Sequence, residues 1–156
     1  MTTIHGTGIL ISGVGVLLRG ASGAGKSDLA MRLIDEGAIL IADDRVEVQV
    51  DQGKVTAAAP ARLTGLIEVR GVGIMRVPFV PRAELHLVVD LVAPGLVERL
   101  PEVGWTPVVK GHLPRIADVR LPRIALAPFE ASAPAKVRLA AAAAYRGDLG
   151  VAPALA

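Results

Sequence analysis

The stretch GASGAGKSDLAMRL, residues 20–33, decides the fold expected of this chain. It matches the pattern G-x-x-x-x-G-K-[ST] at Gly20, Gly25, Lys26 and Ser27. Glycines in such a loop let backbone N–H groups surround a phosphate, and the following helix adds the positive end of its dipole. The pattern therefore predicts a phosphate-binding loop, against the alternative of a glycine-rich structural turn.

The whole glycine loop is assigned to the expected phosphate site. We expect Lys26 to reach the terminal phosphates and the Ser27 hydroxyl to coordinate magnesium. The residues of this predicted nucleotide site are Gly20, Ala21, Ser22, Gly23, Ala24, Gly25, Lys26 and Ser27.

The flanking residues support a strand, loop and helix in that order. GILISGVGVLLRG (8–20) predicts a hairpin that turns at Ser12 and Gly13, with its second strand leading into the loop. After Ser27 apolar residues recur at helical spacing, and Gly37 marks the helix end.

The rest of the chain predicts mostly strands. A buried strand is expected at 38–42 and an antiparallel hairpin at 46–58, and further strands are expected at 66–70, 73–77, 85–92 and 121–127. Five prolines predict a loop-rich stretch from Pro94 to Pro122.

A second helix is expected from Pro134 to Arg146, with Gly147 at its end. Residues 147–156 then read as a flexible C-terminal tail, so the expected domain spans 1–146. Few helices among many strands predict an α/β domain with a mixed, hairpin-rich sheet.

Composition narrows the function classes. Of the 156 residues 52% are hydrophobic but only 3% are aromatic, so base stacking on aromatic side chains is nearly excluded and no aromatic residue is obviously placed to hold adenine. The net charge of +2 and the lack of a dense basic stripe argue against nucleic acid as a partner. No cysteine, leader or apolar run of roughly 18 to 20 residues is present, so we expect a cytoplasmic protein without a membrane partner.

Carboxylates after the loop are candidates for catalysis and metal binding. Asp43 and Asp44 follow the strand at 38–42, and strand alternation would point only one of them at the phosphates; the alternative is a polar turn. Glu68 and Arg70 lie on one face of the next predicted strand. In one interpretation Glu68 is a metal ligand, with the glycines after Arg70 allowing close backbone approach; in the other, Glu68 and Arg70 simply pair with each other.

The three histidines show no metal-ligand spacing. His5 would ordinarily be an exposed surface residue, His86 alternates with apolar residues of a predicted strand, and His112 lies in the proline-rich stretch without a visible partner.

These motifs in this order resemble the catalytic domain of the bacterial HPr kinase/phosphorylase family. The resemblance runs from His5 through GVGVLLRGASGAGKSDLA, LIADDRVEV and GLIEVRGVGI to VRLPRIAL near residue 120, about four fifths of the chain. It implies a P-loop fold similar to the nucleotide-binding part of phosphoenolpyruvate carboxykinase, assembled as a hexamer.

The resemblance also implies an activity: ATP- and Mg²⁺-dependent phosphorylation of a serine on HPr, a phosphocarrier of the phosphotransferase system. The reverse reaction would use inorganic phosphate and release pyrophosphate. The implied catalytic residues are Asp43, Asp44, His5, Lys26 and Arg70, and the implied metal ligands are Ser27, Glu68 and Asp44.

Some features depart from the family pattern. The family's N-terminal domain has no counterpart, which implies a short form restricted to the catalytic domain; Ala21 stands where Asp is common, and APFEASAPAK replaces an expected PGRN element. The lost arginine weakens the case for the reverse reaction. Two other functions stay open at this stage, namely a nucleotide-sensing or phosphate-sensing regulator without turnover and a kinase of a small metabolite.

Overall fold

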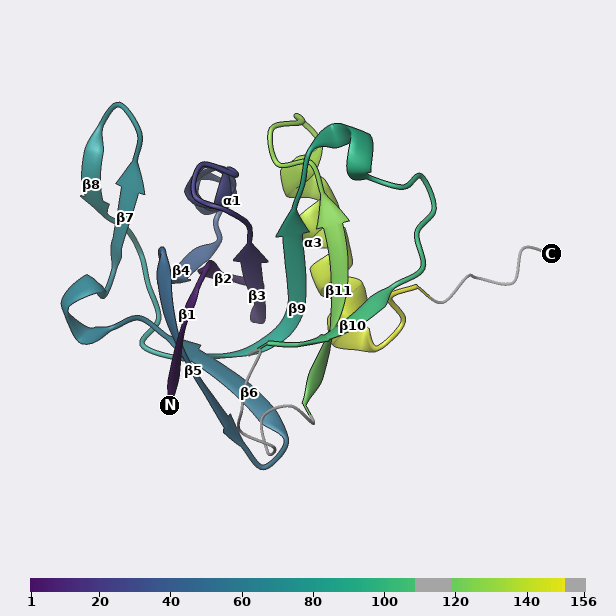
Figure 1. Ribbon diagram of the computed structural model, residues 1–156. Helices are drawn as coiled ribbons and strands as arrows, with labels where there is room; N and C mark the ends of the chain where they lie inside the picture. The colour runs from purple at the N-terminus through teal and green to yellow at the C-terminus, as the bar shows by residue number, and fades with distance from the viewer. Residues whose placement is uncertain (109–118, 151–156) are drawn as a thin grey trace.

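The computed structural model describes residues 1–108 and 119–150, and Figure 1 shows their arrangement. In this part of the chain a nine-stranded mixed sheet has the order β1-β5-β6-β9-β3-β2-β4, with β11 paired to β9 and β10 paired to β11. The strands are β1 (Thr2–His5), β2 (Thr7–Ile11), β3 (Val14–Arg19), β4 (Ile39–Ala42), β5 (Arg45–Asp51), β6 (Lys54–Ala58), β9 (Ala83–Leu91), β10 (Gly104–Pro107) and β11 (Arg120–Leu126).

The strand that leads into the glycine loop lies near the centre of the sheet. β2 and β3 form the predicted antiparallel hairpin, and Ser12 and Gly13 turn it with φ of 47° and 82°. β3 pairs with β9 in parallel on its other edge. At Gly15 a Cβ would overlap the carbonyl oxygen of Glu84, so only glycine lets β3 approach β9 this closely.

Three parallel strands aim their carboxyl ends at one edge of the molecule. β9 pairs in parallel with β3 and with β11, and all other pairs in the described sheet are antiparallel. In Figure 1 these three arrows point upward, toward the loop before α1 (Lys26–Asp35) and the loop before α3 (Ala133–Arg146). Ligands of open α/β sheets bind outside such carboxyl ends.

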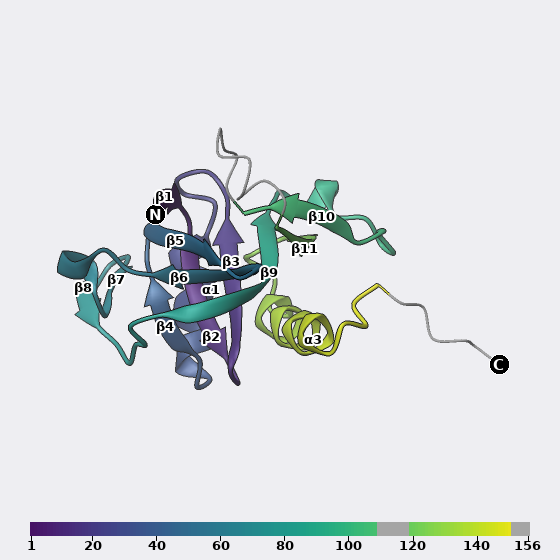
Figure 2. The ribbon, with the colours of Figure 1, turned by 90° about the horizontal axis from the view of Figure 1, so that it is seen from below.

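Two apolar cores lie on opposite faces of the central strands. Alternation along β3 sends Val16 and Leu18 to the core that packs against α1 and α3, and sends Leu17 to the core shared with β5 and β6. Figure 2 shows α3 on the opposite side of β9 from β5 and β6, and α1 packs into the same core as α3. This packing fixes α1, and therefore the glycine loop, against the end of β3.

A separate two-stranded hairpin joins β7 (Leu66–Val69) to β8 (Gly73–Arg76). It stands at the upper left of Figure 1, outside the main sheet. Its inner strand packs on α1 through Ile67, which is buried in the helix-side core. The hairpin therefore holds Glu68 near the start of α1.

Most elements expected from the sequence are confirmed, with boundaries shifted by one or two residues. Two strands were not foreseen: β1, and β10 within the stretch from Pro94 to Pro122 that proline content predicted to be loop. That prediction was wrong for β10, whose proline stands at the last strand position. β11 was expected at 121–127 and is confirmed, with Pro122 placed before its pairing with β9 begins. Residues 109–118 of the same stretch lie outside the described residues. Short 3₁₀ turns at Ala61–Leu63 and Pro94–Leu96 were likewise unexpected.

The second helix ends as expected, since Gly147 adopts φ of 77° at its C-cap. The flexible-tail prediction, which falls largely on residues 151–156, stays a prediction, and His112 lies outside the described residues. Neither described helix has the length and apolar character needed to cross a lipid bilayer.

Candidate active site

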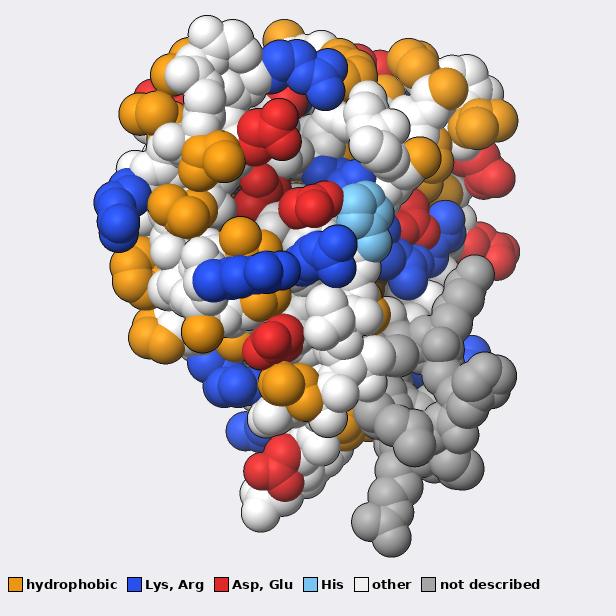
Figure 3. All heavy atoms as spheres, turned by 60° about the vertical axis from the view of Figure 1, so that its left-hand side comes forward, with side chains coloured by type: hydrophobic (Ala, Val, Ile, Leu, Met, Phe, Trp, Pro, Cys, Tyr) orange, Lys and Arg blue, Asp and Glu red, His pale blue; other side chains and the backbone are white. Residues whose placement is uncertain are grey.

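A cavity of about 250 Å³ opens at the start of α1, where the glycine loop faces the turn after β4 and the β7–β8 hairpin. It therefore joins three segments that lie far apart in the sequence. Figure 3 shows acidic, basic and histidine side chains gathered on one face of the molecule. The lining residues are Ser22, Gly23, Gly25, Lys26, Ser27, Asp28, Met31, Asp43, Asp44, Glu68, Val69, Arg70 and Phe129.

The glycine loop has the backbone expected of a phosphate cradle. Gly23 and Gly25 have φ of 80° and 102°, a region that side chains disfavour. Lys26 is 6% exposed, and its Nζ donates hydrogen bonds to the carbonyl oxygens of Gly20 (2.7 Å) and Ala21 (3.0 Å). Burial lowers the pKa of this ammonium group, and the charges of Asp44 and Asp43 oppose the lowering.

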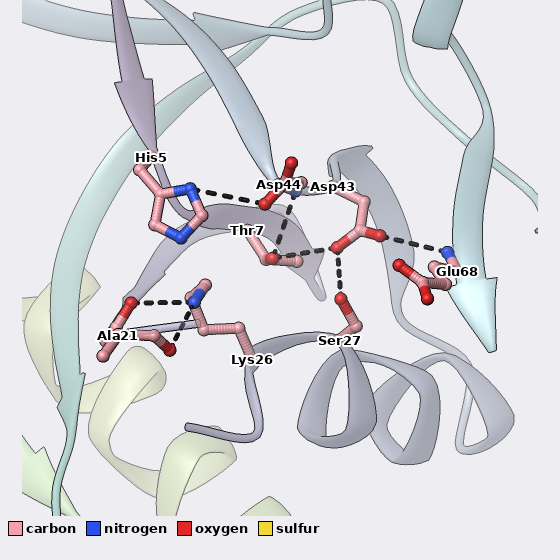
Figure 4. Close-up of polar contacts among 9 residues, drawn as sticks. His5, Thr7, Ala21, Lys26, Ser27, Asp43, Asp44 and Glu68 are labelled. Carbon is pink, nitrogen blue, oxygen red and sulfur yellow. Dashed lines mark hydrogen bonds and ion pairs between the residues drawn. The ribbon is translucent and has the colours of Figure 1, made fainter. Parts of the chain in front are cut away.

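The Asp43 carboxylate is buried and accepts three hydrogen bonds (Figure 4). Oδ1 accepts from the hydroxyls of Ser27 (2.7 Å) and Thr7 (2.9 Å), and Oδ2 accepts from the backbone N–H of Glu68 (3.1 Å). These bonds come from α1, β2 and β7, so Asp43 ties three elements together at the glycine loop.

Asp44 has the opposite environment. Its side chain is 62% exposed, and its Oδ1 lies 3.3 Å from Nδ1 of His5. Strand alternation predicted that only one of the two aspartates would face the phosphates, but both line the cavity. β4 ends at Ala42 and Asp44 turns with φ of 66°, so alternation does not apply to it.

Glu68 and Arg70 line the same cavity from the hairpin, as a shared face predicted. Their charged groups form no ion pair within the described residues, so the simple-pair interpretation of these residues is not supported. Figure 4 shows the Glu68 carboxylate on the side of Asp43 and Ser27.

The predicted site residues are thus brought together. His5, Lys26, Ser27, both aspartates, Glu68 and Arg70 all lie at or beside one cavity, while Gly20 and Ala21 contact Lys26 through their carbonyls. Ala24 faces away from this cavity and lines a neighbouring one. Structure therefore distinguishes residues that the motif alone treats alike.

A second polar cluster anchors the strand that enters the loop. Asp90 on β9 accepts hydrogen bonds from Arg19 Nε (2.8 Å) and Nη2 (3.1 Å) and from Arg123 on β11. Burial by itself would raise the pKa of the Asp90 carboxyl, but the two guanidinium groups hold the pKa below its usual value. The cluster ties the three parallel strands to one another, at the ends of β3 and β9 and the middle of β11.

The oxygen donors at the cavity suit a magnesium ion. Ser27 offers a hydroxyl beside the Asp43 carboxylate, and the carboxylates of Asp44 and Glu68 face the same space. No group of three or more acidic, histidine or cysteine side chains is positioned to hold a metal by itself in the described ranges. Magnesium accepts such a site because it keeps waters and binds substrate phosphates alongside one or two carboxylates.

A family model described as the HPr serine kinase C-terminal domain matches residues 1–137. The chain belongs to this family. Its solved relatives include the HPr(Ser) kinase/phosphatase of Coxiella burnetii, with a TM-score of 0.75 and 25% identity over 89% of this chain and 93% of that one. The family's mixed sheet with few helices is therefore confirmed as the fold.

Curated relatives carry the name HPr kinase/phosphorylase. That of Geobacillus thermodenitrificans is 33% identical over 133 residues, covering 80% of this chain and 42% of the relative. That of Limosilactobacillus reuteri is 36% identical over 139 residues, covering 80% and 40%. The chain spans less than half the length of these relatives.

Sequence reasoning did not assign Asp28, Met31 and Val69 of the cavity wall to the site, and it missed Thr7 and Phe129. Thr7 is buried, donates to Asp43 and accepts a long hydrogen bond from the Asp44 N–H (3.5 Å). Its signal was a polar residue at the start of the apolar strand TGILI, two positions after His5. Phe129 also lines the cavity but follows β11 by three residues, and no local pattern links it to the loop.

Proposed function

We propose that the protein is an ATP- and magnesium-dependent protein-serine kinase that phosphorylates an HPr-like phosphocarrier. The observation that carries this proposal is the cavity in which the glycine loop, two aspartates and Glu68 meet. A phosphate site alone makes a binder, whereas transfer also requires metal ligands and a proton acceptor for the incoming hydroxyl. The names of the curated relatives support the choice of a phosphocarrier as the acceptor.

The inner residues hold the nucleotide in this scheme. The loop N–H groups and Lys26 bind the β- and γ-phosphates, and Ser27, Asp43 and Glu68 would hold magnesium. Bound magnesium would neutralise phosphate charge during transfer. Asp43 replaces Asp44 as the metal-side aspartate in this proposal because Asp43 contacts Ser27 at 2.7 Å.

The outer residues act on the acceptor. Asp44 accepts the proton of the serine hydroxyl while the serine oxygen forms its bond to the γ-phosphorus and the bond from that phosphorus to the ADP oxygen breaks. His5 positions the Asp44 carboxylate, and Arg70 stabilises charge on the transferring group from the hairpin side. The exposure of Asp44 leaves room for a protein-borne serine to approach.

The decisive experiment mixes purified protein, magnesium, γ-labelled ATP and the HPr-like protein of the same organism. We expect labelled phosphoserine on the phosphocarrier, formed at least about 10²-fold more slowly with the Asp44→Asn variant. Arg146→Gln serves as a matched control, because Arg146 is exposed and pairs with Asp148 at the far end of α3.

The outcomes separate the three functions. Nucleotide binding without transfer to any acceptor would favour the sensing regulator, and ADP release with a hydroxyl-bearing metabolite would favour the small-molecule kinase. Incubating phosphoserine-HPr with inorganic phosphate and measuring pyrophosphate tests the reverse reaction.

Two further parts of the proposal concern assembly and location. We propose a hexamer, as the family resemblance implies, and sedimentation velocity measures it directly. We also propose that the kinase works in the cytoplasm, where ATP and a phosphocarrier would be available; cell fractionation with an antibody tests this.

A further inference from the structure

A second cavity lies beside the glycine loop, at the carboxyl ends of β9 and β11. Its volume of about 460 Å³ falls within the range of small-molecule sites, roughly 300–1,000 Å³. Glu130 is the one charged residue among the described residues that line it. The lining residues are Ala24, Leu91, Val92, Ala93, Pro94, Ala127, Pro128, Phe129 and Glu130.

This apolar cavity adjoins the cavity at the start of α1, which is called the phosphate cavity from here on. Phe129 lines both, and the consecutive loop residues Ala24 and Gly25 line one cavity each. A Cβ at Gly25 would lie 2.9 Å from Cζ of Phe129, so the aromatic ring sits directly against the loop. A ligand whose phosphates occupy the loop can therefore extend past Phe129 into the apolar cavity.

The backbone around Phe129 is fixed although its side chain is 69% exposed. The Arg32 guanidinium on α1 donates to the carbonyl oxygens of Pro128 and Glu130, the latter at 3.3 Å. Lys136 on α3 binds the Glu130 carboxylate at 3.0 Å. An exposed aromatic ring on a fixed backbone loses little conformational entropy when a ligand covers it.

We propose that this apolar cavity binds the base of the nucleotide and that Phe129 is the surface on which the base stacks. The inference rests on the proposed kinase function and adds the part of ATP that the glycine loop does not hold. Stacking on an aromatic side chain tolerates any base, and the cavity wall is mostly apolar. The protein therefore discriminates weakly between adenine and guanine nucleotides.

Phe129 belongs to a segment where the sequence departs from the family pattern stated above. It lies in APFEASAPAK, the segment that stands where the family pattern has PGRN. The low aromatic content led us to expect no base stacking, but one well-placed ring is enough.

The test compares magnesium-ATP with magnesium-tripolyphosphate, which lacks a base, by calorimetry on the full chain. For Phe129→Ala we expect ATP affinity to fall about tenfold and tripolyphosphate affinity to stay unchanged. Phe129→Trp should retain ATP binding. Tyr145→Ala removes a similarly exposed aromatic side chain on α3 and should change neither affinity.

A cavity-filling variant provides an independent arm. Ala93 is exposed, lines the cavity and has an extended backbone that accepts a large side chain, so Ala93→Trp should weaken ATP binding and spare tripolyphosphate. Wild-type affinities for ATP and GTP should agree within about threefold.

Each contrary result has a distinct meaning. Equal losses of ATP and tripolyphosphate in Phe129→Ala would show that the ring only supports the loop, and unchanged ATP binding in both variants would place the base elsewhere; either overturns the inference. A large preference for ATP over GTP overturns its specificity part. Failure of the wild-type protein to bind tripolyphosphate would instead count against the proposed function itself.

Discussion

The inner and outer parts of the phosphate cavity are built in contrasting ways. The inner part consists of Lys26, Ser27 and Asp43, of which the lysine and the aspartate are buried and all three are hydrogen-bonded within the protein. The outer part consists of His5, Asp44 and Arg70, whose side chains are exposed to solvent. The consecutive residues Asp43 and Asp44 mark the boundary between the two.

This contrast indicates a division of labour. Groups that bind a small, charged ligand gain from a fixed, partly dry setting, because charge-assisted hydrogen bonds strengthen there. Groups that act on a serine carried by another protein must stay accessible. Changes to the inner part should therefore affect affinity and stability, and changes to the outer part should affect turnover alone.

The largest effect is expected for Asp44→Asn. Loss of the proposed general base should lower kcat by about 10²- to 10⁴-fold, while ATP affinity and the melting temperature stay near wild type because the side chain is exposed. Steady-state transfer assays with calorimetry of ATP binding check this. Equal losses in affinity and kcat would place Asp44 in the inner part.

Lys26→Met should weaken nucleotide binding. The ammonium makes charge-assisted contacts worth roughly 1.5–3 kcal/mol, so we expect a fall in ATP affinity of about 10- to 150-fold. Titration calorimetry measures this fall. Lys54→Met is the matched control, since that lysine is exposed at the start of β6 and lines neither cavity. Unchanged ATP affinity in Lys26→Met would contradict the assigned role.

Asp43→Asn should destabilise the fold itself. The amide nitrogen cannot accept a hydrogen bond, so at least one of the three donors now bound to Asp43 is left without its acceptor, at a cost of about 1–3 kcal/mol. Thermal unfolding should show a lower melting temperature than in Asp44→Asn. A melting temperature equal to that of Asp44→Asn would remove the distinction between the neighbours.

His5→Ala should have a modest effect. The pair with Asp44 is exposed, and such pairs contribute about 0.2–1 kcal/mol, so kcat should fall roughly two- to fivefold with ATP affinity unchanged. A loss as large as that of Asp44→Asn would instead make the imidazole a direct participant in proton transfer.

The smallest effect concerns acid stability. Asp90 has a lowered pKa in the folded protein, so its ion pairs stabilise the fold above the ordinary value of 3.8, and that contribution is lost as pH falls through the folded-state pKa. The stability difference between wild type and Asp90→Asn should therefore narrow on acidification. Denaturant titrations at neutral and acidic pH measure the free energy of unfolding of both proteins. A difference that does not change with pH would show that the charge of Asp90 does not contribute to stability.

Local pattern predicted the parts of the molecule whose elements are neighbours in sequence. The β2–β3 hairpin, the glycine loop and α1 are contiguous in sequence, so turn residues and helical spacing identified them. β1 was missed because its four residues pair with β5, forty or more positions away, and carry no apolar alternation of their own. Proline content also concealed β10.

The site was harder to predict than the fold. The motif and the resemblance identified the charged residues of the site. They did not predict that Asp43 would be buried and Asp44 exposed, because this difference depends on the turn at Asp44 and on the hydrogen bond from Thr7 of β2. Phe129 reaches the loop only through the packing of the segment after β11 against Gly25. Such long-range contacts leave no periodic trace in the chain.

The shared strand β9 has a consequence for unfolding. Its first residues pair with β6 and its last residues pair with β11 on the same edge, while β3 occupies the other edge. If the part of the sheet containing β5 and β6 separated from the part containing β10 and β11, the hydrogen bonds of β9 to one of these parts would break. Denaturation should thus be a single cooperative event, in which the glycine loop after β3 and the β5–β6 hairpin unfold together.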